Sequence, residues 1–197
     1  LKLCYITRVV RLPSDVFVTM RFDALQAVTK ISQMLAESAG SPANLNPVMK
    51  VIAEEAGVSA AFALLVNPGA DKLLPAASHG LNVSDFRRLE NRGDSSVLRA
   101  VFDRSEVRRI DDLATEPGLD FLAAAGVVSL LAVPIRPAPK PLGVLCVRFH
   151  TEARKNADEL ERFLSVVAAM VAQSLRVEHA VLGERQLRVV RADDAHG

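Results

Sequence analysis

Aromatic residues and cysteines are scarce in this sequence. It has no tryptophan, a single tyrosine and two cysteines, Cys4 and Cys146. So few cysteines exclude a disulfide framework and are typical of a reducing compartment. Proteins that bind single-stranded nucleic acid stack its bases on aromatic side chains, and too few are present here for such a platform.

The sequence also lacks an excess of charge and a long hydrophobic segment. Its formal net charge is +1, whereas a nucleic-acid surface usually needs a basic stripe. The longest apolar run, Phe121–Ile135, has 15 residues and contains Gly126, Ser129 and Pro134, whereas a membrane-spanning helix needs about 20. Basic residues interrupt the N-terminus, which leaves no signal peptide. We therefore expect a cytoplasmic protein that contacts neither a membrane nor nucleic acid directly.

Half of the residues are hydrophobic, and their spacing is most informative in the C-terminal part. Two apolar runs, Val127–Ile135 and Leu142–Phe149, flank a proline-rich turn and predict two antiparallel strands. Asn156 and Glu159 then have the form of a capping box at the start of a helix. Apolar residues at three- and four-residue steps give this helix one hydrophobic stripe: Leu160, Phe163, Leu164, Val167, Met170, Val171 and Leu175.

The earlier part of the chain predicts further helices and one more hairpin. The expected elements are a helix over Phe22–Ala39, a helix capped by Asn46 and ended by Gly57, strands Ser59–Val66 and Lys72–Ser78, helices Leu81–Glu90 and Ser95–Asp103, a strand Val107–Ile110 and a helical turn Leu119–Ala125. These elements predict an α+β fold with a central antiparallel sheet of five to six strands. The terminal helices are expected on one face of the sheet, and the short helices and loops on the other.

Three motifs carry a resemblance to a known family. They are the strand Ser129–Pro134, the strand that begins with Gly143-Val144-Leu145, and the helix that carries Ala168, Ala169 and Ala172. In this order and spacing they resemble the GAF family, the small-molecule sensing domains of bacterial signalling proteins. The likeness covers roughly residues 22 to 176. It implies that a small molecule binds between the sheet and the layer of short helices and loops.

The chain divides into three parts. Residues 1–20 are expected to be an N-terminal extension with little order, either part of a preceding domain or upstream of a start at Met20. Residues 21–176 are expected to form the sensor domain. Residues 177–197 continue the last helix and end in a frayed tail from Arg191. Because this exit helix has no sheet to cover, it is expected to pair with a second copy of the chain.

Candidate ligand-binding residues follow from strand alternation and from the resemblance. On the strand Ser59–Val66, Ala61, Ala63 and Leu65 share the face with smaller side chains, which leaves more room for a ligand. The candidate set is Ala63, Leu65, Ser95, Ser96, Arg99, Asp111, Phe121, Ser129 and Leu131. A core filled by side chains, with no ligand, is the alternative.

The polar candidates have specific roles. Arg99 would contact an anionic group, because a guanidinium matches carboxylate and phosphate geometry. Ser95 and Ser96 open a helix, whose free N–H groups attract anions, although Asp94 opposes this. Asp111 would accept hydrogen bonds from a ligand, or it simply ends a strand at a turn.

No group of residues has the spacing of a catalytic or metal site. The motifs that GAF domains use for cyclic nucleotides or bilins are absent. Cys146 lies in an apolar strand, which disfavours the thiol chemistry of free methionine sulfoxide reductases. We therefore expect a non-catalytic sensory domain that signals through its C-terminal helix as a homodimer. The alternatives are a ligand-free dimerisation module and, less favoured, a thiol-dependent reductase.

Overall fold

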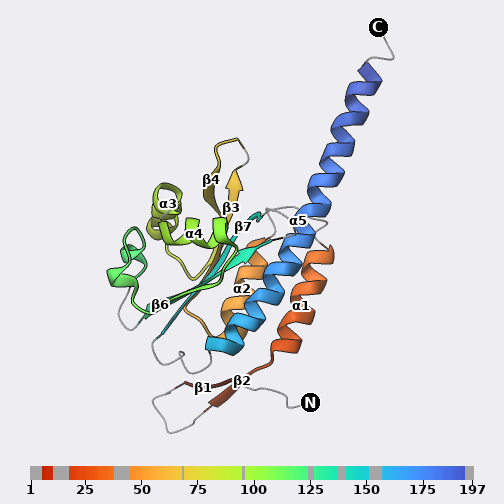
Figure 1. Cartoon of the computed structure of the whole chain (residues 1–197). Helices are drawn as coiled ribbons and strands as arrows, with labels where there is room; N and C mark the ends of the chain where they lie inside the picture. Colours follow the sequence, from red (N-terminus) through yellow and green to blue (C-terminus); the bar gives the residue numbers. More distant parts are fainter. Residues whose placement is uncertain are drawn as a thin grey trace.

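The computed structural model describes residues 6–10, 18–37, 45–67, 69–94, 96–123, 127–136, 141–150 and 157–193 (Figure 1). In chain order the elements are β1 Ile6–Val10, β2 Val18–Phe22, α1 Ala24–Glu37, α2 Leu45–Ala56, β3 Ala60–Asn67, β4 Lys72–His79, α3 Val83–Arg92, α4 Ser96–Arg104, β5 Arg108–Ile110, the 3₁₀ turns η2 Leu113–Thr115 and η3 Asp120–Leu122, β6 Val127–Ile135, β7 Gly143–His150 and α5 Ala157–Asp193.

The central sheet has five strands in the order β4-β3-β7-β6-β5, and every neighbouring pair is antiparallel. Both predicted hairpins, β3–β4 and β6–β7, are present, and β7 pairs with β3 to join them. The α+β prediction is therefore confirmed. Because β7 and β3 are neighbours, the middle of the sheet is formed by strands that lie far apart in the sequence.

Helices α1, α2 and α5 form a layer on one face of the sheet (Figure 1). We call the side chains between this layer and the sheet the helix-side core. Its strand residues include Ala61, Ala63, Ala77, Leu131, Val133, Leu145, Val147 and Phe149, and its helix residues include Ile31, Ile52, Leu164 and Val171. The predicted placement of the terminal helices on one face is confirmed.

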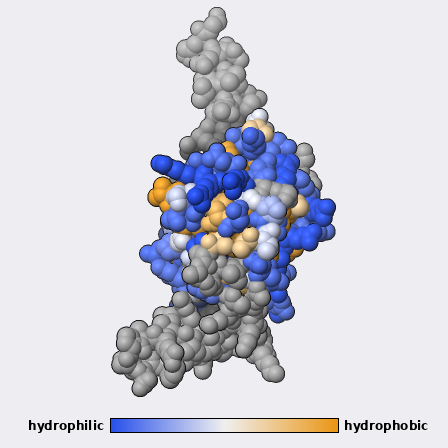
Figure 2. All heavy atoms as spheres, turned by 90° about the vertical axis from the view of Figure 1, so that its left-hand side faces the viewer, coloured by the Kyte–Doolittle hydropathy of each residue, from blue (hydrophilic) through white to orange (hydrophobic). Residues whose placement is uncertain are grey.

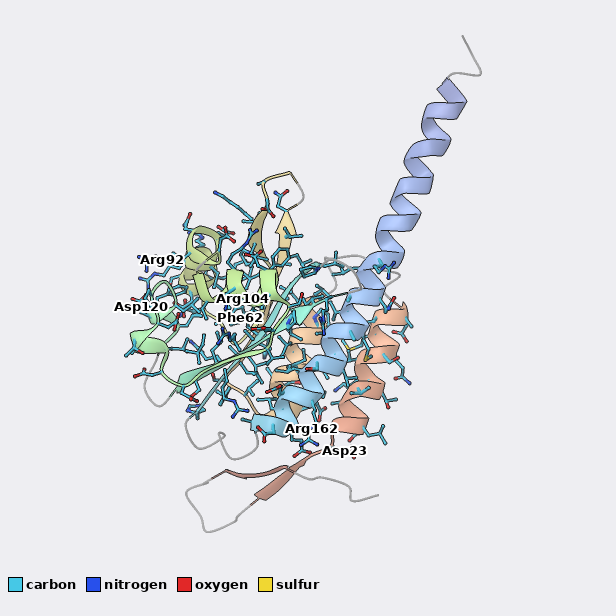
Figure 3. The ribbon with its side chains drawn as sticks, viewed as in Figure 1. Asp23, Phe62, Arg92, Arg104, Asp120 and Arg162 are labelled. Carbon is cyan, nitrogen blue, oxygen red and sulfur yellow. The ribbon has the colours of Figure 1, made fainter. Side chains whose placement is uncertain are left out.

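Helices α3 and α4 and the turns η2 and η3 form the second layer, on the opposite face (Figure 1). The second-layer core between them and the sheet contains Phe62, Leu64, Leu130, Ala132, Val144 and Cys146 from the strands, and Leu89, Leu98, Val101, Leu113 and Leu122 from the second layer. Phe62 lies at the centre of this region (Figure 3). Alternate residues of β3 and β7 thus contribute to different cores, as the pleat of a strand requires.

One expectation needs correction at the ends of elements, and two stay predictions. Within the N-terminal extension Ile6–Val10 and Val18–Phe22 form an antiparallel hairpin, β1–β2, separate from the central sheet; the degree of order of this extension stays a prediction. Helix α2 begins at Leu45, so Asn46 is not its cap; instead the Asn46 side chain accepts a hydrogen bond from the backbone N–H of Ser78 in β4. Helix α5 runs to Asp193, and the frayed tail from Arg191 stays a prediction.

The end of helix α2 agrees with the prediction from the sequence. Gly57 follows α2 with a φ of 63°, the left-handed conformation that commonly ends a helix at glycine. Helix α5 passes through Gly183 without interruption. Asn156 lies outside the described residues, so the predicted capping box stays a prediction.

Candidate functional site

The second layer rests on the sheet through a tightly filled apolar core. Phe62, Leu64, Leu98, Leu122 and Cys146 are all completely buried. The contact is close enough that a Cβ on Gly93, at the end of α3, would lie 2.5 Å from Leu64 Cδ2. In this conformation apolar side chains from the sheet and from the second layer are buried against one another.

The predicted pocket residues do not share one face of the sheet. Ala63 and Leu131 belong to the helix-side core and are completely buried there, and Leu65 packs against the same core. These three residues therefore lie on the sheet face that is covered by the helix layer and not on the face toward the second layer; ligand binding by them stays a prediction. Their face lies beneath the helices, and α2 contacts both β3 and β4, because small residues such as Ala61, Ala63 and Ala77 allow a helix to approach closely.

Two of the predicted residues are joined across a strand end. The buried Ser129 hydroxyl donates a hydrogen bond of 3.3 Å to the backbone carbonyl of Asp111. The Asp111 residue is exposed, and it follows β5 directly. This bond holds the end of β5 against β6, which agrees with the strand-end alternative; ligand binding by either residue stays a prediction.

Arg99 lies on α4, but its guanidinium is occupied by carboxylates. Its Nε donates to Asp103 at 3.0 Å, and its Nη2 donates to Asp71 Oδ2 at 3.1 Å. Asp94 lies 3.7 Å away, and the guanidinium also lies over the Phe102 ring. Hydrogen bonds to Asp103 and Asp71 raise the pKa of Arg99. Arg99 thus ties the β3–β4 turn to α4 in this structure. Ser95 lies outside the described residues, and only the backbone of Ser96 is described, as the first residue of α4.

Phe121 lines a cleft on the outer surface of the second layer. The cleft has a volume of about 360 Å³ and is lined by Arg88, Asn91, Arg92, Asp120 and Phe121. The Arg88 guanidinium lies 5.9 Å from the centre of the Phe121 ring, and Arg92 pairs with Asp120 at 3.6 Å (Figure 3). Figure 2 shows that the surface on this side is mostly hydrophilic, with hydrophobic residues exposed near its centre.

A residue that the sequence analysis missed is Arg148, the most buried arginine that the structure describes. It lies on β7, and the alternation with Val147 and Phe149 directs it toward the second layer. Its Nη1 donates to the Leu122 carbonyl at 2.9 Å, and its Nε lies 3.4 Å from Ser59 Oγ. Burial lowers the pKa of Arg148, and the nearby charge of Asp85 opposes that shift. The signal available in the sequence was a lone charge within an otherwise apolar strand.

Asp85 belongs to the same region and is also buried. It lies in the first turn of α3, where Asn82 caps the helix by accepting a hydrogen bond from the Asp85 N–H at 2.8 Å. The Asn82 amide in turn donates to Asp85 Oδ2 at 2.9 Å. The Asp85 carboxylate at the start of α3 is near enough to Arg148 for its charge to oppose the lowering of the pKa of that guanidinium.

Thiol and metal chemistry have little support in the described residues. Cys146 is completely buried, and its burial raises the pKa of the thiol, whereas a reactive cysteine needs an accessible thiolate. Within the described ranges no group of three His, Cys, Asp or Glu residues is arranged to hold a metal ion. No described helix is both long and apolar enough to cross a bilayer.

Comparison with known proteins agrees with this architecture. The chain is 28% identical over 171 residues to the Nif-specific regulatory protein of Herbaspirillum seropedicae, a match that covers 82% of this chain and 31% of that protein. The chain thus spans about a third of the length of that relative.

Two solved structures share the fold. The GAF domain from a phosphoenolpyruvate-protein phosphotransferase of Coxiella burnetii has 20% identity and a TM-score of 0.69, over 81% of this chain and 96% of that one. The free methionine-R-sulfoxide reductase of Neisseria meningitidis, solved with its substrate, has 16% identity and a TM-score of 0.63, over 81% and 92%. The family model for the GAF domain matches residues 43–175, about two thirds of the chain, and this chain therefore belongs to the GAF domain family.

Proposed function

We propose that this GAF domain is a non-catalytic sensor of a small molecule, and that it signals through α5 as a homodimer in the cytoplasm. The supporting observation is the position of α5. Its N-terminal half packs on the sheet through buried residues such as Leu164 and Val171, while the same continuous helix extends to Asp193, beyond the body of the domain (Figure 1). A change in the sheet would reach the far end of this helix.

The second layer would be the part that responds to a ligand. It meets the sheet opposite the helix layer, and residues of one strand, such as Cys146 and Val147 of β7, reach both cores. A ligand that binds one face more tightly in one arrangement of the sheet would therefore shift the packing under α5. The matched relative is a regulatory protein, which supports a role in signalling.

A ligand-free dimerisation module is the second candidate. The burial of the second-layer core supports it, because residues such as Phe62 and Leu98 are completely buried there and a ligand would need room among them. A thiol-dependent reductase has less support, since the buried Cys146 would have to become exposed and ionised before reacting.

Thermal unfolding of the whole chain against a panel of metabolites separates these functions. The sensor predicts that at least one compound raises the unfolding midpoint saturably, since a ligand that binds only the folded state stabilises it. If no compound shifts the midpoint while sedimentation shows a dimer, the ligand-free module is correct. Turnover of free methionine sulfoxide that depends on Cys146 would establish the reductase instead.

A further inference from the structure

Arg148 is a buried cation, and none of the described residues forms an ion pair with it. The residue is 9% exposed, and its two described hydrogen-bond partners, the Leu122 carbonyl and the Ser59 hydroxyl, are both neutral. Asp85 is near enough for its charge to act on Arg148, yet within the described residues no ion pair to this guanidinium is formed. Arg99, which is half-buried, is by contrast paired directly with carboxylates.

This arrangement is unfavourable unless something compensates for it. Removing a guanidinium from water is costly, and buried charges are normally paired with an opposite charge. The Ser59 hydroxyl donates its hydrogen to the backbone carbonyl of Arg148 at 2.7 Å. Ser59 therefore contacts both the backbone and the guanidinium of Arg148. A buried guanidinium, whose planar fork of N–H donors matches the geometry of a carboxylate, is well suited to a planar anion.

The segment that now accepts from Arg148 is a short 3₁₀ turn without strand pairing. The Leu122 side chain is completely buried in the second-layer core, whereas the polar contacts of η3 with α3 are the exposed pair Arg92–Asp120 and the contact of Arg88 with Phe121. Exposed ion pairs of this kind contribute little. A carboxylate would form stronger, charge-assisted hydrogen bonds with Arg148 than the neutral carbonyl does, and it would therefore displace η3 from the guanidinium.

We propose that Arg148 is the ligand-recognising residue of this domain and that it binds the carboxylate of a small organic acid in place of the Leu122 carbonyl. The proposal rests on the sensor function proposed above, and it names the class of ligand. Displacement of η3 opens the second layer next to β7. Val147 and Phe149, the neighbours of Arg148 on that strand, lie in the helix-side core together with α5, so the site is one residue away from the signalling helix.

Asp85 decides between the two anions that a guanidinium recognises. Its carboxylate lies beside the site and is held by the Asn82 amide at 2.9 Å. A phosphate carries up to two negative charges and meets more repulsion from Asp85 than a carboxylate does. The site therefore favours a carboxylate over a phosphate.

The test uses the whole chain and sodium salts of acetate, succinate, glutarate and citrate, each compared with sodium chloride at equal ionic strength. At least one organic acid is expected to raise the unfolding midpoint saturably. Arg148→Lys keeps the charge but loses the fork, and it should bind that acid about tenfold more weakly, the factor for one lost hydrogen bond to a charged group. Arg108→Lys, at an exposed position of β5, is the matched control and should bind like the wild type.

The same screen includes neutral sugars and nucleosides, so that the two proposals can fail separately. A neutral compound that stabilises the wild type and Arg148→Lys equally would overturn the organic-acid inference and leave the sensor function standing. Organic acids without effect beyond sodium chloride would also overturn the inference. If Arg148→Lys does not fold, the Arg148 Nε–H resonance of the wild-type protein decides: it should shift on titration with the stabilising acid, and an unchanged resonance would refute direct binding.

Discussion

At the scale of single residues, β7 shows how two neighbours on one face acquire different chemistry. Cys146 and Arg148 both point toward the second layer. Cys146 is surrounded by apolar side chains such as Phe62 and Leu130, whereas Arg148 reaches the polar backbone of η3. Burial favours the neutral form of both groups, because it raises the pKa of the Cys146 thiol and lowers the pKa of the Arg148 guanidinium.

The buried thiol predicts a dependence of stability on alkaline pH. The ordinary pKa of the thiol is 9.0, and burial raises it in the folded protein. Above pH 9 the unfolded chain therefore releases a proton that the folded chain keeps, and the free energy of unfolding falls as the pH rises. In a Cys4→Ser background, the stability of the protein relative to its Cys146→Ala variant should fall by about 1.4 kcal/mol per pH unit above pH 9.

Urea unfolding of the two proteins between pH 7 and pH 10.5 measures this difference directly. The Cys146→Ala variant is the control, because every other titrating group is shared. A difference in stability that stays constant across the range would show that the thiol is accessible in the folded state. That result would also support the thiol-dependent reductase as the function of this domain.

The sequence identified the residue types on each strand but not which face they would occupy. The small side chain of Ala63 indicated room for a ligand, yet the same property allows a helix to approach closely. The alternation of side chains along a strand indicates which residues share a face of the sheet, but it does not indicate which layer of helices covers that face. Arg148 was missed because its importance depends on burial by η3, a contact between positions 26 residues apart.

At the scale of elements, the pairing of β3 with β7 is the contact that joins the two hairpins. It depends on Gly143 at the start of β7, opposite Leu65 in the register. A Cβ at Gly143 would collide with the Leu64 carbonyl oxygen and would lie 2.9 Å from Leu65 Cδ2. The close approach of the two backbones therefore requires glycine at this position.

Gly143→Ala is therefore expected to destabilise the domain by about 3 kcal/mol, since overpacking here would push backbone against backbone. Chemical denaturation monitored by circular dichroism measures the effect. Gly69→Ala is the matched control, because a Cβ there meets nothing closer than 3.6 Å, and it should change stability by less than about 0.5 kcal/mol. Equal effects of the two substitutions would contradict the register of β3 and β7.

The elements themselves were largely predictable. The period of apolar residues indicated the helices and both hairpins, since each depends on neighbours within about ten residues. The pairing of β3 with β7 was not predictable from one sequence. It joins Ala60–Leu65 to Gly143–Arg148, and all residues of the second layer lie between these two segments in the sequence. Asn46 resembled a helix cap, but its side chain contacts Ser78 of β4 instead, a long-range bond that no local pattern reveals.

At the scale of the whole molecule, the proposal depends on the exit part of α5 as a dimer contact. Gly183 lies within this helix, and glycine weakens a helix by about 1 kcal/mol relative to alanine. Gly183→Ala should therefore strengthen self-association, and Gly183→Pro, which breaks a helix, should weaken it. Sedimentation equilibrium compares the two variants at one position, and equal dissociation constants would show that the dimer does not use this segment.

If the proposed function is correct, the folded domain holds a small molecule while it is paired through α5. Native mass spectrometry of the protein, purified gently from its own organism, measures both properties at once. We expect a dimer that is heavier than two polypeptide chains by one small molecule per protomer, and that loses this mass on denaturation. A dimer with the mass of the polypeptides alone would contradict the sensor and favour the ligand-free module.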